Sequence, residues 1–298
     1  MASPDLSLLS TQFRELGAPV FGKKVVEWDL RNQGIQVRTN VTMPQALVKL
    51  SAQGGPRPYR EQDDFGNGPQ FTERILTVNQ TKQDWTFNPE NFRNTILADT
   101  DGAPMPFWEM AVGQMSKEFL SSLMLNGLYG GTYNASGTTP AACVTGWGTI
   151  IAAEIAASNL IPVTGADITT SNAVAQVELV KNAVPVWMKQ MGFTIYCSYS
   201  TFEKYATNYR TVNGFKFEPR ITGDYPIDNS LAILKPVAWM GTSQRLIATI
   251  DNNLVLGTNV EAVSIYSTPY LDYLKNRITF PVGCQIQDLD AIVVSDQA

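Results

Sequence analysis

The chain has 298 residues, of which 44% are apolar, and a formal net charge of −5 at pH 7. This size and composition predict one large folded domain or two closely joined ones, and they exclude wholesale disorder. Because the charge is mildly acidic and no dense lysine and arginine cluster occurs, binding driven by nucleic-acid phosphates is not expected. Histidine is absent, which removes the commonest general base and the commonest metal ligand.

The cysteines and the N-terminus indicate a protein made in the cytosol. Cys143, Cys197 and Cys284 lie far apart and form no C-x-x-C pair, so we interpret them as reduced, buried thiols. The first residues lack the basic and apolar regions of a signal peptide. No window approaches the roughly 18 apolar residues that a membrane span needs.

The first 50 residues predict an arm, a strand and a short helix. Residues 1–24 are polar and punctuated by proline and glycine, which is typical of an extended arm. Residues 24–30 alternate like a strand. Thr42-Met43-Pro44-Gln45 has the pattern of a capping box with proline in the first turn, which predicts a helix through Leu50.

A long hairpin-like excursion is predicted over residues 53–86. Its first part, residues 52–70, is polar and rich in glycine and proline, whereas residues 75–78 and 85–87 have strand character. Loops longer than about 12–15 residues are uncommon unless they have a function. Since an isolated two-stranded hairpin is only marginally stable in water, we expect this one to pack on another subunit.

The clearest helix is predicted over residues 106–126. Pro106 suits the first helical position, Asn126-Gly127 is a stop signal, and apolar residues recur every four positions between them. About 20 residues give a rod of roughly 30 Å. Asn88-Pro89-Glu90 is expected to cap a short helix before it, followed by a turn at 99–106.

After a hinge-like stretch at 130–140, the sequence predicts a mixed α/β region. Helices are expected at 149–160, after Thr170, after Pro185 and from a Ser200 capping box through Tyr209. Strands are expected at 193–197, 231–237, 246–250, 254–256, 277–282 and 290–294. The last two are expected to dock into a sheet begun earlier in the chain.

Three patterns that could carry chemistry fail in detail. Residues 17–24 have the spacing of a phosphate-binding loop, but Lys24 stands where serine or threonine would hold magnesium. Residues 99–102 resemble the start of a calcium loop, but Pro104 and Met110 replace the required glycine and glutamate. The acidic groups at 61–64 and 288–290 are interpreted as surface charge. We therefore predict no catalytic, cofactor or metal site.

The aromatic residues around the long helix could in principle form a base-stacking platform. No arginines or lysines are interleaved with them, so packing in the core or at an interface is the better interpretation. They are Trp85, Phe87, Phe92, Phe107 and Trp108.

The order of these parts resembles the major capsid proteins of tailed phages, a fold also seen in encapsulins. The phrases that carry the resemblance are Leu125-Asn126-Gly127, Val163-Thr164-Gly165, and the segments 253–258 and 285–294. The resemblance implies an α+β fold with an arm (1–24), a peripheral domain (25–139) with an extended loop (53–86) and a spine helix (106–126), an axial domain (140–258) and a return to the peripheral domain (259–298).

The resemblance also implies a function: self-assembly through pentamers and hexamers into an icosahedral-type shell around viral DNA. Expected partners are further copies of the chain, a portal, a separate scaffolding protein and the packaged DNA, without a cofactor or a membrane. Assembly is expected in the host cytoplasm, and the final location is the virion capsid. The implied contact residues are Tyr59, Arg60, Phe65, Phe71 and Arg74 in the loop and Trp108, Met115 and Phe119 on the spine helix.

Two departures from the family pattern matter. The loop offers only Lys82, outside its tip, so no covalent crosslinking is expected. About 24 residues precede the first strand, which leaves no room for a cleavable scaffolding segment. Three alternatives stay open: an encapsulin-like cellular shell, an α/β enzyme or binding protein with an unrecognised pocket, and a phage tail or decoration protein.

Overall fold

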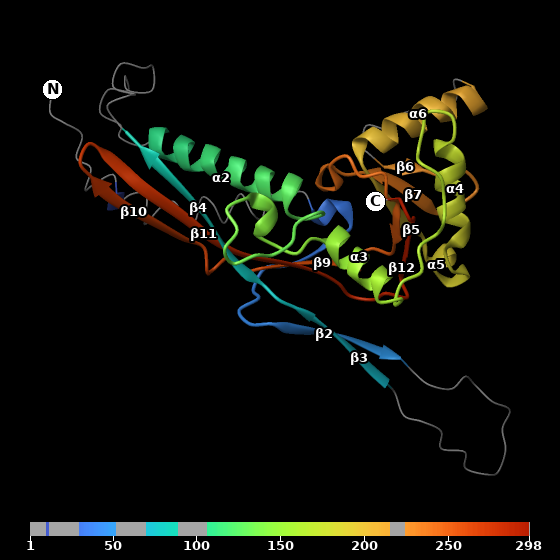
Figure 1. Ribbon diagram of the computed structural model, residues 1–298, viewed down its shortest axis with the longest axis horizontal. Helices are drawn as coiled ribbons and strands as arrows, with labels where there is room; N and C mark the ends of the chain where they lie inside the picture. The colour runs from blue at the N-terminus through green and yellow to red at the C-terminus, as the bar shows by residue number, and fades with distance from the viewer. Residues whose placement is uncertain (1–9, 12–29, 52–69, 89–105, 215–223, 298) are drawn as a thin grey trace, which may run out of the picture.

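The computed structural model describes residues 10–11, 30–51, 70–88, 106–214 and 224–297 (Figure 1). Within these ranges the chain is α+β. Its helices are η1 (Arg31–Gln33), α2 (Pro106–Asn126), η4 (Pro140–Ala142), α3 (Trp147–Ala156), α4 (Ala173–Ala183), α5 (Val186–Met191), α6 (Tyr199–Asn213) and η5 (Ala238–Met240).

The strands fall into two five-stranded sheets and one two-stranded ribbon. They are β1 (Gln36–Arg38), β2 (Gln45–Ser51), β3 (Gln70–Leu76), β4 (Asn79–Phe87), β5 (Phe193–Cys197), β6 (Tyr225–Pro226), β7 (Ala232–Pro236), β8 (Ile247–Thr249), β9 (Leu254–Thr258), β10 (Ser264–Tyr270), β11 (Tyr273–Ile286) and β12 (Ile292–Val294).

The first sheet is built around the 14-residue strand β11. One edge of β11 pairs with β4, from Leu274 to Val282, and the other pairs first with β10 and then, from Val282 onward, with β9. Its residues alternate between buried and exposed from Leu274 to Phe280, as expected for a sheet covered on one face. Helix α2 lies along this sheet (Figure 1), and Phe119 packs edge-on against Phe280 with ring centroids 6.3 Å apart. The predicted helix at 106–126 is confirmed.

The second sheet has the order β12-β8-β5-β7-β6. Its central strand β5 is buried at all five positions, which confirms the predicted strand at 193–197. Helices α4, α5 and α6 lie beside it (Figure 1). The helix predicted from Ser200 is present, but its cap is Ser198, whose side-chain oxygen accepts a hydrogen bond from the backbone N–H of Thr201 at 3.3 Å.

The chain passes between the two sheets at two points late in the sequence. The turn after β8 leads from the second sheet into β9 of the first, and residues 287–291 lead from β11 back to β12. The terminal strands do dock into sheets begun earlier, as predicted. They dock into different sheets, however, because β12 pairs with β8, whereas the sequence placed both in a return to the peripheral domain.

The segment predicted as a helix from Thr42 to Leu50 is instead strand β2. It pairs antiparallel with β3, with Gln45 opposite Leu76 and Ser51 opposite Gln70. The hairpin predicted over residues 53–86 is therefore offset. Its paired strands are 45–51 and 70–76, whereas residues 79–87 form β4 and belong to the first sheet.

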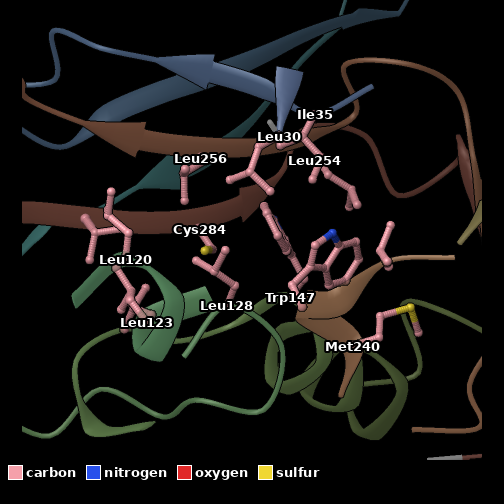
Figure 2. Close-up of a cluster of buried hydrophobic side chains, with 14 of the residues drawn as sticks. Leu30, Ile35, Leu120, Leu123, Leu128, Trp147, Met240, Leu254, Leu256 and Cys284 are labelled. Atoms are coloured by element: carbon pink, nitrogen blue, oxygen red, sulfur yellow. The ribbon is translucent and has the colours of Figure 1, made fainter. Parts of the chain in front are cut away.

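The main core joins both sheets to α2 and α3. Figure 2 shows side chains from α2, β9 and β11 converging with Trp147 of α3 and Met240 of η5. A second cluster fills the space between α4, α5, α6 and the second sheet. We call the first sheet with α2 the first unit, and the second sheet with α4, α5 and α6 the second unit. Because the first cluster contains residues of both sheets, the two units share buried apolar area and are not independently packed.

Several predictions lie outside the described residues. They are the arm at 1–24 apart from residues 10–11, nearly all of the strand at 24–30, the helix after Asn88, the turn at 99–106 apart from Pro106, and the tip of the extended loop. Within the described ranges, no helix combines the length and apolar character that a bilayer crossing requires.

Candidate assembly surface

The two-stranded ribbon formed by β2 and β3, called the ribbon below, extends away from both sheets (Figure 1). Successive side chains of a strand point to opposite faces, so the pairing register assigns each residue to one of two faces. Leu47 and Leu76 lie on one of them and are 1% and 0% exposed, packed with Val41 and Val255. This inward face fixes the base of the ribbon to the body of the subunit.

Lys49 adds an ionic contact to the inward face. Its Nζ lies 2.6 Å from Asp288 Oδ1 and 2.5 Å from Asp290 Oδ2, in the segment between β11 and β12. Partial burial lowers the pKa of Lys49, but the hydrogen bonds to the two carboxylates outweigh it and raise the pKa above its usual value. The ribbon is thereby tied to the segment that connects the two sheets.

Arg74 supplies a second tie. Its Nη2 lies 2.6 Å from Glu154 Oε1 of α3 and 3.2 Å from Gln285 Oε1 of β11, and Gln285 in turn donates to the backbone oxygen of Ile75. Burial raises the pKa of Glu154, but hydrogen bonds from Asn159 and Arg74 outweigh it and lower the pKa below its usual value. Both partners are mostly shielded from water, which makes this pair stronger than an exposed one.

The outward face is apolar and exposed. Paired across the ribbon are Leu50 with Phe71 and Ala46 with Ile75, while Val48 faces Glu73. The exposed fractions are 46% for Val48, 61% for Leu50, 67% for Phe71 and 58% for Ile75. We call these four residues the apolar face of the ribbon. Contiguous exposed apolar side chains of this kind mark surfaces that associate with a partner.

The structure places the predicted contact residues in different environments. Phe71 lies on the apolar face, whereas Arg74 points inward and binds its own subunit. Phe119 is buried in the core against Phe280, and Met115 is half-buried. Tyr59, Arg60, Phe65 and the side chain of Trp108 lie outside the described residues.

Sequence reasoning missed Lys49 and three of the four residues of the apolar face. Residues 45–50, Gln-Ala-Leu-Val-Lys-Leu, contain an apolar run and no clear alternation, and the capping pattern at Thr42 favoured a helix. Leu47 and Val48 are equally apolar neighbours, and only the pairing with β3 shows which of them faces the body.

Comparisons of sequence find nothing similar: no protein-family model matches the chain, and no curated protein matches it. Solved structures do match. A chain in the procapsid of satellite phage P4, solved with its size determination (Sid) protein, covers 100% of this chain and 92% of its own length, with 12% identity and a TM-score of 0.59. The capsid of Myoviridae phage XM1 matches with a TM-score of 0.53 and 13% identity, covering 90% of each chain.

This chain has the capsid-protein fold of tailed phages and encapsulins. The encapsulin likeness is to the SrpI complex from Synechococcus elongatus, with a TM-score of 0.51, 8% identity, and coverage of 90% of this chain and 87% of that one. These structures share the fold of this chain at identities of 8–13%. The α+β architecture expected from the order of elements is confirmed.

Proposed function

We propose that this protein is a structural subunit that assembles with copies of itself, through pentamers and hexamers, into a closed capsid shell around viral DNA. The proposal rests on the capsid fold along nearly the whole chain and, above all, on the apolar face of the ribbon. A surface of this kind on an extended element fits a contact with a neighbouring copy.

The energetics support a contact of this type. Full burial of a large apolar side chain contributes about 1.5–3 kcal/mol. The four residues of the apolar face would each gain part of that on docking, while the ties on the inward face hold the ribbon in one orientation on its own subunit. A closed shell repeats one head-to-tail contact many times, so a modest contact per subunit is sufficient.

The finer parts of the proposal follow the family resemblance. The peripheral domain would hold α2 as the spine helix, and the axial domain would lie around the second sheet. A portal, a separate scaffolding protein and the packaged DNA would be further partners. The role is structural and not catalytic, assembly takes place in the host cytoplasm, and the final location is the virion capsid.

A cellular shell is the second candidate, favoured by the likeness to the SrpI encapsulin complex. The two candidates share the fold and the ribbon contact. They differ in the contents of the native particle, because a virion holds DNA whereas an encapsulin holds protein. Nuclease treatment and mass spectrometry of purified native particles separate them.

A charge placed on the apolar face tests the proposal. Phe71→Asp and Leu50→Asp should block assembly, because a buried unpaired carboxylate is costly, while the subunit itself stays folded. Thr72→Asp is the matched control, since this exposed neighbour lies on the opposite face of the ribbon. Sedimentation velocity reports assembly, and circular dichroism reports folding. Unchanged particles from the folded Phe71→Asp and Leu50→Asp variants would refute the role of this face.

A further inference from the structure

The short turn at residues 30–35 lies where the two sheets meet. Its last residues lead directly into β1, which pairs in parallel with β9 of the first sheet. Leu30 and Ile35 are each 1% exposed and belong to the core cluster that both sheets share. Figure 2 shows them beside Leu254 and close to Trp147.

Hydrogen bonds from two strands of the second sheet and from η5 converge on this turn. Tyr196 of β5 donates its hydroxyl to the backbone oxygen of Gln33 at 2.5 Å, and Trp239 of η5 donates its indole N–H to Gln33 Oε1 at 3.1 Å. Lys235 of β7 donates to the backbone oxygen of Asn32 at 3.0 Å. These donors come from three separate elements, so the turn is held from several directions at once.

Gly34 makes the contact tight. Its φ of +83° is in the left-handed region that favours glycine, and its backbone oxygen accepts a hydrogen bond from Asn252 N–H at 2.8 Å. A Cβ at this position would lie 2.7 Å from Asp251 Oδ1 and 2.9 Å from the Tyr196 hydroxyl. The backbone of the turn thus approaches the second unit more closely than a side chain would allow.

The apolar packing around the turn does not by itself fix the angle between the two sheets. Trp239 contacts Trp147 and Tyr196, with ring centroids 5.0 and 5.7 Å apart. Apolar and aromatic contacts are tolerant of small sliding, whereas buried hydrogen bonds favour one geometry. Burial raises the pKa of Tyr196 above its usual range, so the phenol stays protonated and remains a donor.

We propose that the turn at residues 30–35 acts as a clamp that fixes the angle between the two sheets, with Gln33 as its central positioning residue. This inference rests on the proposed function, in which the angle between the sheets sets the curvature that each subunit contributes to a shell. Uniform particles would then require an intact clamp, although the turn itself need not lie at any subunit contact.

The clamp can be tested with two spin labels in the full-length chain, one at Lys117→Cys on α2 and one at Thr207→Cys on α6, in a Cys143→Ser background. These two positions are exposed on opposite units, and the remaining cysteines are buried. Pulsed electron spin resonance would compare the label distances in Gln33→Ala, Tyr196→Phe and the double variant. Tyr205→Phe is the control, because this buried tyrosine lies in the core of the second unit alone.

We expect the clamp variants to broaden the distance distribution and shift its mean, most of all in the double variant, and to give particles of mixed diameter in electron micrographs. Tyr205→Phe should leave the distance unchanged even if it lowers the melting temperature. A sharp, unshifted distance in a folded double variant would overturn the clamp. Failure of the parent chain to assemble would count against the shell function alone, because the distance measurement does not depend on assembly.

Discussion

At the scale of single residues, the direction of the ribbon depends on a few charged side chains. Arg74 joins α3 and β11 to β3, and Lys49 joins β2 to the connection between the sheets. The family resemblance implied Arg74 as a contact to a neighbouring subunit, because it falls in the expected extended loop. Its partner Glu154 lies 80 residues further along the chain, so the intramolecular pair could not be read from local sequence.

Replacement of Glu154 tests this tie. Its folded-state pKa is lowered, so the unfolded chain binds more protons, and the stabilisation is present above the unfolded pKa of about 4.3 and is lost as the pH falls through the folded value. Glu154→Gln should therefore cost about 1–3 kcal/mol near neutral pH. In acid the difference from the parent should disappear.

Urea unfolding of the subunit near neutral pH and again well below the carboxylate pKa measures both parts of this expectation. Glu203→Gln, at an exposed glutamate of α6, is the control and should change stability by less than about 0.5 kcal/mol. A loss for Glu154→Gln that is equal at both pH values would show that the ion pair is not its cause.

At the scale of elements, local signals identified those whose ends and packing are set nearby. Pro106 and Asn126-Gly127 mark both ends of α2, and the apolar run at 193–197 marks β5. Elements defined by distant partners were misjudged. The capping pattern at Thr42 predicts a helix where strand β2 lies. The sequence gives no signal for β10, because Ser267, Thr268 and Pro269 interrupt its apolar alternation, although its pairing with β11 is regular.

The crossing of β11 beneath the base of the ribbon gives a prediction at this scale. A Cβ at Gly283 would lie 2.0 Å from the backbone oxygen of Thr77, and backbone cannot move aside as a side chain can. Gly283→Ala should destabilise the subunit by about 1–3 kcal/mol or more.

The same substitution at Gly113 of α2 provides the control, because no atom lies within 4 Å of its Cβ position. Alanine there should stabilise the helix by about 0.5–1 kcal/mol. Thermal unfolding of the two variants beside the parent measures both effects. Equal melting temperatures for Gly283→Ala and the parent would mean that the crossing is looser than its geometry indicates.

At the scale of the whole molecule, the sequence predicted the order of parts but not how they divide in space. The existence of an extended hairpin followed from its length and composition. Its apolar face did not, because Leu47 and Leu76 are as apolar as Val48 and Leu50, and the choice between the faces is made by body contacts such as Lys49 with Asp288, 239 residues apart. The pairing of β9 with β11 in the first sheet, and of β12 with β8 in the second, likewise depends on residues far apart in the sequence.

The central claim is that copies of this chain close into a shell. The most direct test is electron microscopy of the purified full-length protein, with sedimentation velocity over a wide concentration range. The account predicts closed particles, or rings of five and six subunits, with the apolar face of the ribbon buried against a neighbouring copy. A folded protein that stays monomeric at every concentration, or that forms only open tubes, would contradict it.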